Sequence, residues 1–155
     1  MALTALGDYE AIDLKDGFVR VNTKKYSVEI PKGWEVGEET GFGQREYVSK
    51  KGEMSTMTGS AVNRTWDQLY QTSLFFIRRS GAGEPTPYKL SKSAKGLDVM
   101  SFEMVNDKKQ PVSKYVIFKN DKSEILALSV KIKDRSVEKD LEKAFERMVK
   151  TAEMK

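Results

Sequence analysis

Residues 26–36 read YSVEIPKGWEV, and this stretch decides the fold that we expect. In its first half apolar and polar residues alternate, which is typical of a strand with one buried face. Pro31 has no backbone N–H for a neighbouring strand, and Gly33 permits a turn that a side chain would obstruct. Trp34 follows, and its large ring needs cover on most sides. The stretch therefore predicts a strand that ends in a sharp turn and holds one tryptophan at the rim of a core.

Length and composition indicate one ordinary globular domain. The chain has 155 residues, enough to bury a hydrophobic core, with 39% hydrophobic and 32% charged residues. The net charge is only +4. The paired basic residues are Lys24-Lys25, Lys50-Lys51, Arg78-Arg79 and Lys108-Lys109. Because these pairs form no single basic stripe interleaved with aromatic residues, we expect no nucleic-acid binding.

The chain contains no cysteine and no histidine. This absence excludes thiol nucleophiles, disulfides, Cys/His zinc sites, Ser-His-Asp chemistry and imidazole acid–base steps. Catalysis by carboxylates alone stays open as a third class of function, because it needs no imidazole. It would require carboxylates facing one another across a cleft, whereas Glu38 and Glu39 are loop neighbours and Asp134 and Glu138 flank a helix start. We therefore expect no enzyme and no catalytic residue.

Two short segments resemble ligand motifs only in part. Residues 41–43, Gly-Phe-Gly, are a fragment of a phosphate loop and lack the further glycines and the spacing of a nucleotide fingerprint. Residues 120–124 offer oxygen ligands without the spacing of a calcium-binding EF-hand loop. Both fit better as turns. We expect no cofactor, no cofactor-binding residue and no metal site.

No apolar run approaches the roughly 20 residues needed to span a bilayer, so no transmembrane segment is predicted. Residues 1–16 show no clear periodicity, and we expect a lead-in segment with a turn of helix near residues 9–14. This segment lacks a basic start and is not a signal peptide as written. A chain without cysteine tolerates both the cytosol and the outside of the cell. The cysteine count therefore does not distinguish a reducing from an oxidising compartment.

Periodicity divides residues 17–155 into strands and two helices of a single domain. Strands are expected at residues 18–21, 26–30, 45–49, 54–62, 88–93, 97–105, 112–119 and 124–133, and helices at 66–79 and 137–153. Thr65 and Gln68 form a capping box at the start of the first helix, and Ser136 is a suitable N-cap for the second. Several late strands are apolar on both faces, so both faces of their sheet need cover. The predicted fold is α+β, a mostly antiparallel sheet with one helix packed on each face.

This element order, together with Tyr26, Pro31, Gly33 and Trp34, resembles the PsbP-like family of α/β/α sandwiches. The resemblance covers about residues 17–152, and the four residues are the structural motif that carries it. It implies a non-enzymatic accessory or protein-binding domain, since family members include extrinsic photosystem II subunits, a nuclear-import factor and exported bacterial proteins. Some photosystem members bind metals through histidine, a property that this chain cannot share.

The resemblance also implies location and partners. We expect a monomer that binds another protein, such as a component of a membrane-associated complex. We expect export to the periplasm, thylakoid lumen or extracellular space, with a leader encoded upstream of residue 1; a cytoplasmic location is the alternative.

The first helix carries the candidate interface. Its aromatic residues are too many to share one face, so we expect Phe75 or Phe76 to be exposed. Arg78 and Arg79 follow in the last turn, where cations suit the helix dipole. Together these four residues are the predicted interface. The alternative function is a small-ligand carrier with a pocket between the first helix and the sheet, near Tyr70 and Phe76.

Overall fold

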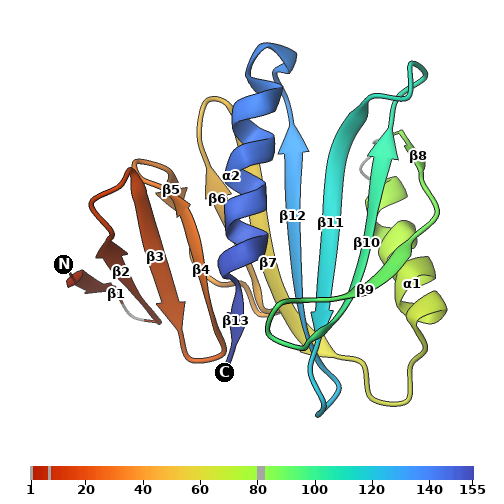
Figure 1. Ribbon diagram of the computed structural model, residues 1–155, viewed down its shortest axis with the longest axis horizontal. Helices are drawn as coiled ribbons and strands as arrows, with labels where there is room; N and C mark the ends of the chain where they lie inside the picture. The colour runs from red at the N-terminus through yellow and green to blue at the C-terminus, as the bar shows by residue number, and fades with distance from the viewer. Residues whose placement is uncertain (1, 7, 80–82) are drawn as a thin grey trace.

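The computed structural model describes residues 2–6, 8–79 and 83–155 and shows two antiparallel sheets and two helices (Figure 1). The smaller sheet has the strand order β1-β2-β3-β4-β13. Its strands are β1 (Ala2–Leu6), β2 (Tyr9–Asp13), β3 (Phe18–Thr23), β4 (Tyr26–Pro31) and β13 (Glu153–Met154). The expected hairpin across Asn22 and Ser27 is confirmed by the pairing of β3 with β4.

The larger sheet has the order β5-β6-β7-β12-β11-β10-β8, and β9 pairs with β10 as well. Its strands are β5 (Glu35–Val36), β6 (Gln44–Val48), β7 (Gly52–Ser60), β8 (Glu84–Pro85), β9 (Lys89–Lys92), β10 (Asp98–Val105), β11 (Pro111–Lys119) and β12 (Glu124–Ile132). The helices are α1 (Trp66–Arg79) and α2 (Glu138–Thr151). The predicted α+β class, with a mostly antiparallel sheet and a helix on each face, is confirmed.

Strand alternation sends the side chains of the larger sheet into two separate cores. One core lies under α1 and includes Met100, Phe102 and Leu74. The other lies under α2 and joins Leu126 of β12 to Val28 of β4, so it fills the space between the two sheets. Helix α2 therefore packs against both sheets, whereas α1 packs against one (Figure 1).

Two details differ from the prediction, which placed all strands in one sheet. The strands at residues 18–31 form a separate small sheet with the N-terminal strands. The predicted turn of helix near residues 9–14 is wrong, because Tyr9–Asp13 is strand β2. Tyr9 and Ala11 lie on either side of the exposed Glu10, which allows a strand there, and pairing with β3 selects it.

The second helix also begins and ends differently. Ser136 does not cap it: the Asp134 carboxylate accepts a hydrogen bond from the Ser136 N–H at 2.9 Å and caps a 3₁₀ turn at Arg135–Val137, and α2 follows Val137 without a side-chain cap. The helix ends at Thr151 because Ala152 is extended and the chain then pairs with β4 as β13. Sheet pairing at Ser27 and Tyr26 thus ends a helix that side-chain periodicity alone extends to residue 153.

Close packing at Gly52 sets the distance between α2 and the larger sheet. A Cβ at this position would lie 2.7 Å from the Lys131 carbonyl oxygen and 2.9 Å from Leu141 Cδ1. Only glycine lets β7, β12 and α2 approach this closely. Gly33, by contrast, has open space around it and is required by its φ of +90° in the turn after Pro31.

Candidate functional site

Helix α1 presents the candidate interface because its start and its inner face are fixed. The Gln68 N–H donates to Thr65 Oγ1 at 3.1 Å, and the Thr65 N–H donates to Gln68 Oε1 at 2.8 Å. This is the predicted capping box, and it is confirmed. Leu69, Tyr70 and Leu74 are buried against the sheet. The face of the helix that carries Gln71, Phe75 and Phe76 is exposed to solvent.

Phe75 and Phe76 both lie on the outer face of α1, with exposed fractions of 61% and 63%. Their ring centroids are 5.4 Å apart in an edge-to-face arrangement. The Arg79 guanidinium lies 5.7 Å from the centroid of the Phe75 ring. Aromatic and arginine side chains are the types enriched where proteins bind one another.

Arg78 and Arg79 extend this aromatic pair into a cationic surface. With Gln71 and Phe75 they line a hollow of about 430 Å³ along the outside of the helix. Among the side chains that the structure describes, neither arginine has an ion-pair partner. We call Phe75, Phe76, Arg78 and Arg79 the α1 outer patch.

The sequence motif that predicted the fold lies where the two sheets meet. Tyr26 is fully buried in β4, Pro31 ends that strand, and Gly33 forms the turn after it. Trp34 is partly buried and packs against the core under α2. None of the four residues belongs to the α1 outer patch.

A buried polar cluster, missed by sequence reasoning, lies at the same joint. The Arg45 side chain is completely buried, donates to the Gly37 carbonyl oxygen at 2.7 Å, and pairs with Asp8. Burial alone would lower the pKa of Arg45, but hydrogen bonds to Asp8 and Tyr26 outweigh it and raise that pKa. The guanidinium therefore stays charged and ties β6 to the chain before β2. A single arginine in an alternating strand gave no signal of this role.

Three hydroxyl groups complete this cluster. Tyr26 Oη lies 2.8 Å from Thr56 Oγ1 and 3.3 Å from Tyr47 Oη. Burial raises the pKa of Tyr47 well above its ordinary value, so the phenol stays protonated. Because Tyr26 is in the small sheet and the other two are in the larger one, these hydrogen bonds hold the sheets together.

The alternative function expected a ligand pocket between α1 and the sheet, near Tyr70 and Phe76. The Tyr70 ring packs there edge-on against Phe102 with a centroid distance of 5.1 Å, and its hydroxyl donates to the Thr86 carbonyl oxygen at 2.7 Å. Phe76 points away into solvent.

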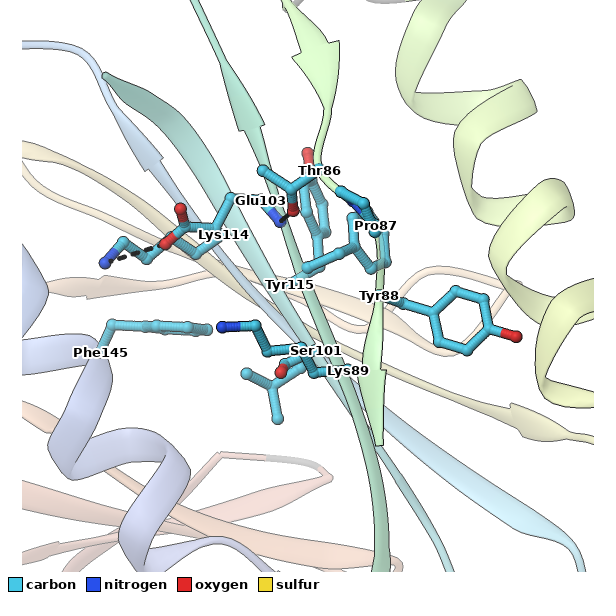
Figure 2. Close-up of a pocket in the computed structure, with 11 residues that line it drawn as sticks. Thr86, Pro87, Tyr88, Lys89, Ser101, Glu103, Lys114, Tyr115 and Phe145 are labelled. Atoms are coloured by element: carbon cyan, nitrogen blue, oxygen red, sulfur yellow. Dashed lines mark hydrogen bonds and ion pairs between the residues drawn. The ribbon is translucent and has the colours of Figure 1, made fainter. Parts of the chain in front are cut away.

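A hollow lies beside α2, at the edge of the larger sheet where the chain passes from β8 to β9. Its volume is about 420 Å³, and Figure 2 shows its lining. Phe145 of α2 lies on one side, and the segment from Thr86 to Lys89 lies on the other. We call this space the α2-side hollow.

Neither a metal centre nor a membrane helix is visible in the described residues. Histidine and cysteine are absent from the chain, and the described carboxylates form no group of three or more that could hold a metal ion. No helix in the described part of the chain is long and apolar enough to cross a membrane.

The arrangement is that of a small α/β/α sandwich with a polar joint and one helix face open to solvent. Comparison of structures shows the PsbP-like fold. The chain is similar to the solution structure of cyanobacterial PsbP (CyanoP) from Synechocystis sp. PCC 6803, with a TM-score of 0.63. The match covers 98% of this chain and 95% of that one, at 13% sequence identity. No protein-family model and no curated protein sequence matches the chain.

The expected resemblance to the PsbP-like family is thus confirmed at the level of the fold. At 13% identity the likeness concerns the fold alone, and it assigns no site residue.

Proposed function

We propose that this domain is a non-enzymatic accessory protein that binds another protein through the α1 outer patch. The observation that carries the proposal is the adjacent pair Phe75 and Phe76, each more than 60% exposed and joined by Arg79. Two large apolar rings side by side in water are unfavourable unless something covers them.

Charge indicates the chemistry of the partner. The α1 outer patch contributes two guanidinium groups that no described carboxylate neutralises. An acidic surface with an apolar centre would pair with both arginines and cover both rings. We therefore propose a partner protein that presents such a surface, as a component of a larger assembly to which this domain adds as a monomer.

The remaining features support an accessory role without catalysis. The buried charged and hydroxyl groups around Arg45 and Tyr26 hold the two sheets together and are closed to substrate. We propose export as the location, because the resemblance to the PsbP-like family implies it. An epitope-tagged chain in its own organism should fractionate with the exported proteins; recovery in the cytosol would contradict that location.

Affinity capture with matched baits tests the proposal. The wild-type domain should retain one stoichiometric protein from extracts of its own organism, and the double variant F75S/F76S should lose it. Leu90→Ser is the control, because Leu90 is 55% exposed on a different element. A second comparison tests the charges. It sets the variants Arg78→Gln and Arg79→Gln against Lys108→Gln and Lys109→Gln, which change a basic pair in the β10–β11 turn.

The outcomes separate the proposal from its competitors. Equal retention by wild type and F75S/F76S would overturn the site. If the same variant instead abolished cosedimentation with vesicles of anionic lipid while no protein was retained, the patch would be a membrane contact and the protein-binding function would be wrong. A reproducible hydrolase or transferase activity lost on one carboxylate substitution would contradict the non-enzymatic role.

A further inference from the structure

The α2-side hollow is separate from the α1 outer patch and combines an apolar wall with polar side chains, as small-ligand sites do. Phe145, Val116 and Pro87 supply the apolar wall, whereas the aromatic residues Tyr88, Phe102 and Tyr115 of its lining belong to the core under α1. Its lining residues are Thr86, Pro87, Tyr88, Lys89, Ser101, Phe102, Glu103, Lys114, Tyr115, Val116 and Phe145. Its volume of about 420 Å³ lies within the range of ligand pockets, roughly 300–1,000 Å³.

Two polar side chains in this hollow have no partner in the described structure. Ser101 of β10 and Lys89 of β9 are directly opposite each other in the antiparallel ladder. Opposed residues share a face of the sheet, so the hydroxyl and the ammonium group converge. Figure 2 shows the end of Lys89 reaching toward the ring of Phe145. Neither Lys89 nor Ser101 makes a side-chain hydrogen bond or ion pair with another described side chain.

The other cation in the hollow is already neutralised. Lys114 Nζ lies 2.6 Å from Glu142 and 3.4 Å from Glu103. Burial lowers the pKa of Lys114, but these two carboxylates outweigh it and raise that pKa, so Lys114 stays charged and paired. Lys114, Glu103 and Glu142 together carry one net negative charge, which the charge of Lys89 balances. Lys89 is nevertheless the lysine of the hollow that pairs with no described carboxylate, so it is the group that can pair with a ligand carrying one negative charge.

The ladder also explains why Lys89 can serve a ligand while Lys92 cannot. Lys92 lies on the opposite face of β9 and pairs with Asp98 at 2.6 Å. Its charge is thus satisfied within the protein. A lysine on an edge strand can also simply discourage pairing with another chain, and that role would predict no saturable ligand.

We propose that the α2-side hollow binds a monocarboxylate with an apolar or aromatic body. The carboxylate accepts hydrogen bonds from the Lys89 ammonium and the Ser101 hydroxyl, and the body packs against Phe145, Val116 and Pro87. The same chemistry is offered by a free small acid and by the C-terminal carboxylate of a peptide that ends in an apolar residue.

A titration followed by ¹H–¹⁵N NMR tests this site with defined probes. The free acid is phenylacetate and its uncharged counterpart is 2-phenylethanol; the peptide is acetyl-Gly-Gly-Phe and its counterpart is the C-terminal amide. We expect saturable shifts at the amides of Lys89, Ser101 and Lys114, with each carboxylate bound about tenfold more tightly than its neutral counterpart. Tighter binding of phenylacetate or of the peptide then identifies the source of the carboxylate.

Variants on one strand supply the matched comparison. Lys89→Met should abolish the preference for carboxylates, and Ser101→Val should weaken it, because each removes one donor and leaves the apolar wall. Lys92→Met, on the opposite face of β9, should leave both affinities within about twofold. Ser101 is half-buried in β10, and valine is favoured in strands although it is larger than serine, so we expect Ser101→Val to fold.

Absence of saturable shifts with both carboxylates would overturn the proposal and leave Lys89 as an edge-strand charge. Equal affinity for acid and alcohol, or binding unchanged in Lys89→Met, would also overturn it. The variant F75S/F76S should give the wild-type titration, since the α1 outer patch does not line the hollow. Failure here and failure of the protein-binding function are therefore distinguishable.

Discussion

Helices α1 and α2 have the same length, 14 residues, but different surroundings (Figure 1). Helix α2 lies against both sheets and is fixed by charges as well as by its core residues: Arg147 donates to Glu29 at 2.9 Å and to Asp16 at 2.7 Å. Helix α1 covers one sheet face and takes part in none of the ion pairs among the described residues. The comparison separates a helix that holds the domain together from a helix that has side chains free to bind.

The largest effect expected from this difference is the truncation of a core residue of α2. Met148 is fully buried between the two sheets, so Met148→Ala should lower the free energy of unfolding by about 2–5 kcal/mol. Urea unfolding followed by circular dichroism measures it. A loss below about 1 kcal/mol would mean that α2 does not hold the sheets as described.

The close approach of α2 to the sheet gives the next largest effect. Gly52→Ala should destabilise the domain by about 1–3 kcal/mol, because its Cβ would overlap Lys131 and Leu141. Gly41→Ala is the matched control, since a Cβ there meets nothing within 4 Å. The two urea midpoints should differ clearly; equal midpoints would show that the gap beside α2 can widen without cost.

The charge contacts of α2 predict a smaller effect that depends on pH. The hydrogen bond from Arg147 is the main cause that lowers the pKa of Asp16 below its ordinary 3.8. A carboxyl with a lowered pKa stabilises the folded state above the unfolded pKa, and that stabilisation is lost as pH falls through the folded pKa. At pH 6 the free energy of unfolding should therefore be larger for wild type than for Asp16→Asn, and the two free energies should converge below pH 3.8.

Urea midpoints at several pH values measure this difference. Asp107→Asn is the control, because Asp107 lies in an exposed turn and joins none of the ion pairs described. A constant difference between wild type and Asp16→Asn across the whole pH series would contradict the assigned role of Arg147.

The smallest effect on stability is expected at the α1 outer patch. Phe and Ser have similar helix propensities and both rings are exposed, so F75S/F76S should change the free energy of unfolding by less than about 1 kcal/mol. Thermal and urea unfolding measure it. A loss comparable to that of Met148→Ala would show that the aromatic pair stabilises the fold and is not kept for binding.

The sequence predicted local structure where one signal was sufficient. The capping box at Thr65 and Gln68 placed α1, and the two-sided apolar strands showed that the sheet needs a helix on each face. Counting the residues that one helix face can bury predicted that Phe75 or Phe76 is exposed, and in the structure both are.

What the sequence did not show depends on contacts between distant segments. The division into two sheets, strand β13 and the Arg45 cluster all arise from pairing partners far apart in the chain, such as Glu153 with Ser27. The α2-side hollow was likewise not predicted, because Lys89, Ser101 and Phe145 meet only after β9, β10 and α2 have assembled.

Site-specific photo-cross-linking in the native organism tests the central claim most directly. A benzophenone amino acid replaces Phe76 in one chain and Leu90 in another, two exposed positions on different elements. If the α1 outer patch is the binding surface, one protein should be cross-linked in high yield from position 76 and not from position 90. Equal yields at the two positions, or a product from position 90 alone, would contradict the assignment of binding to α1.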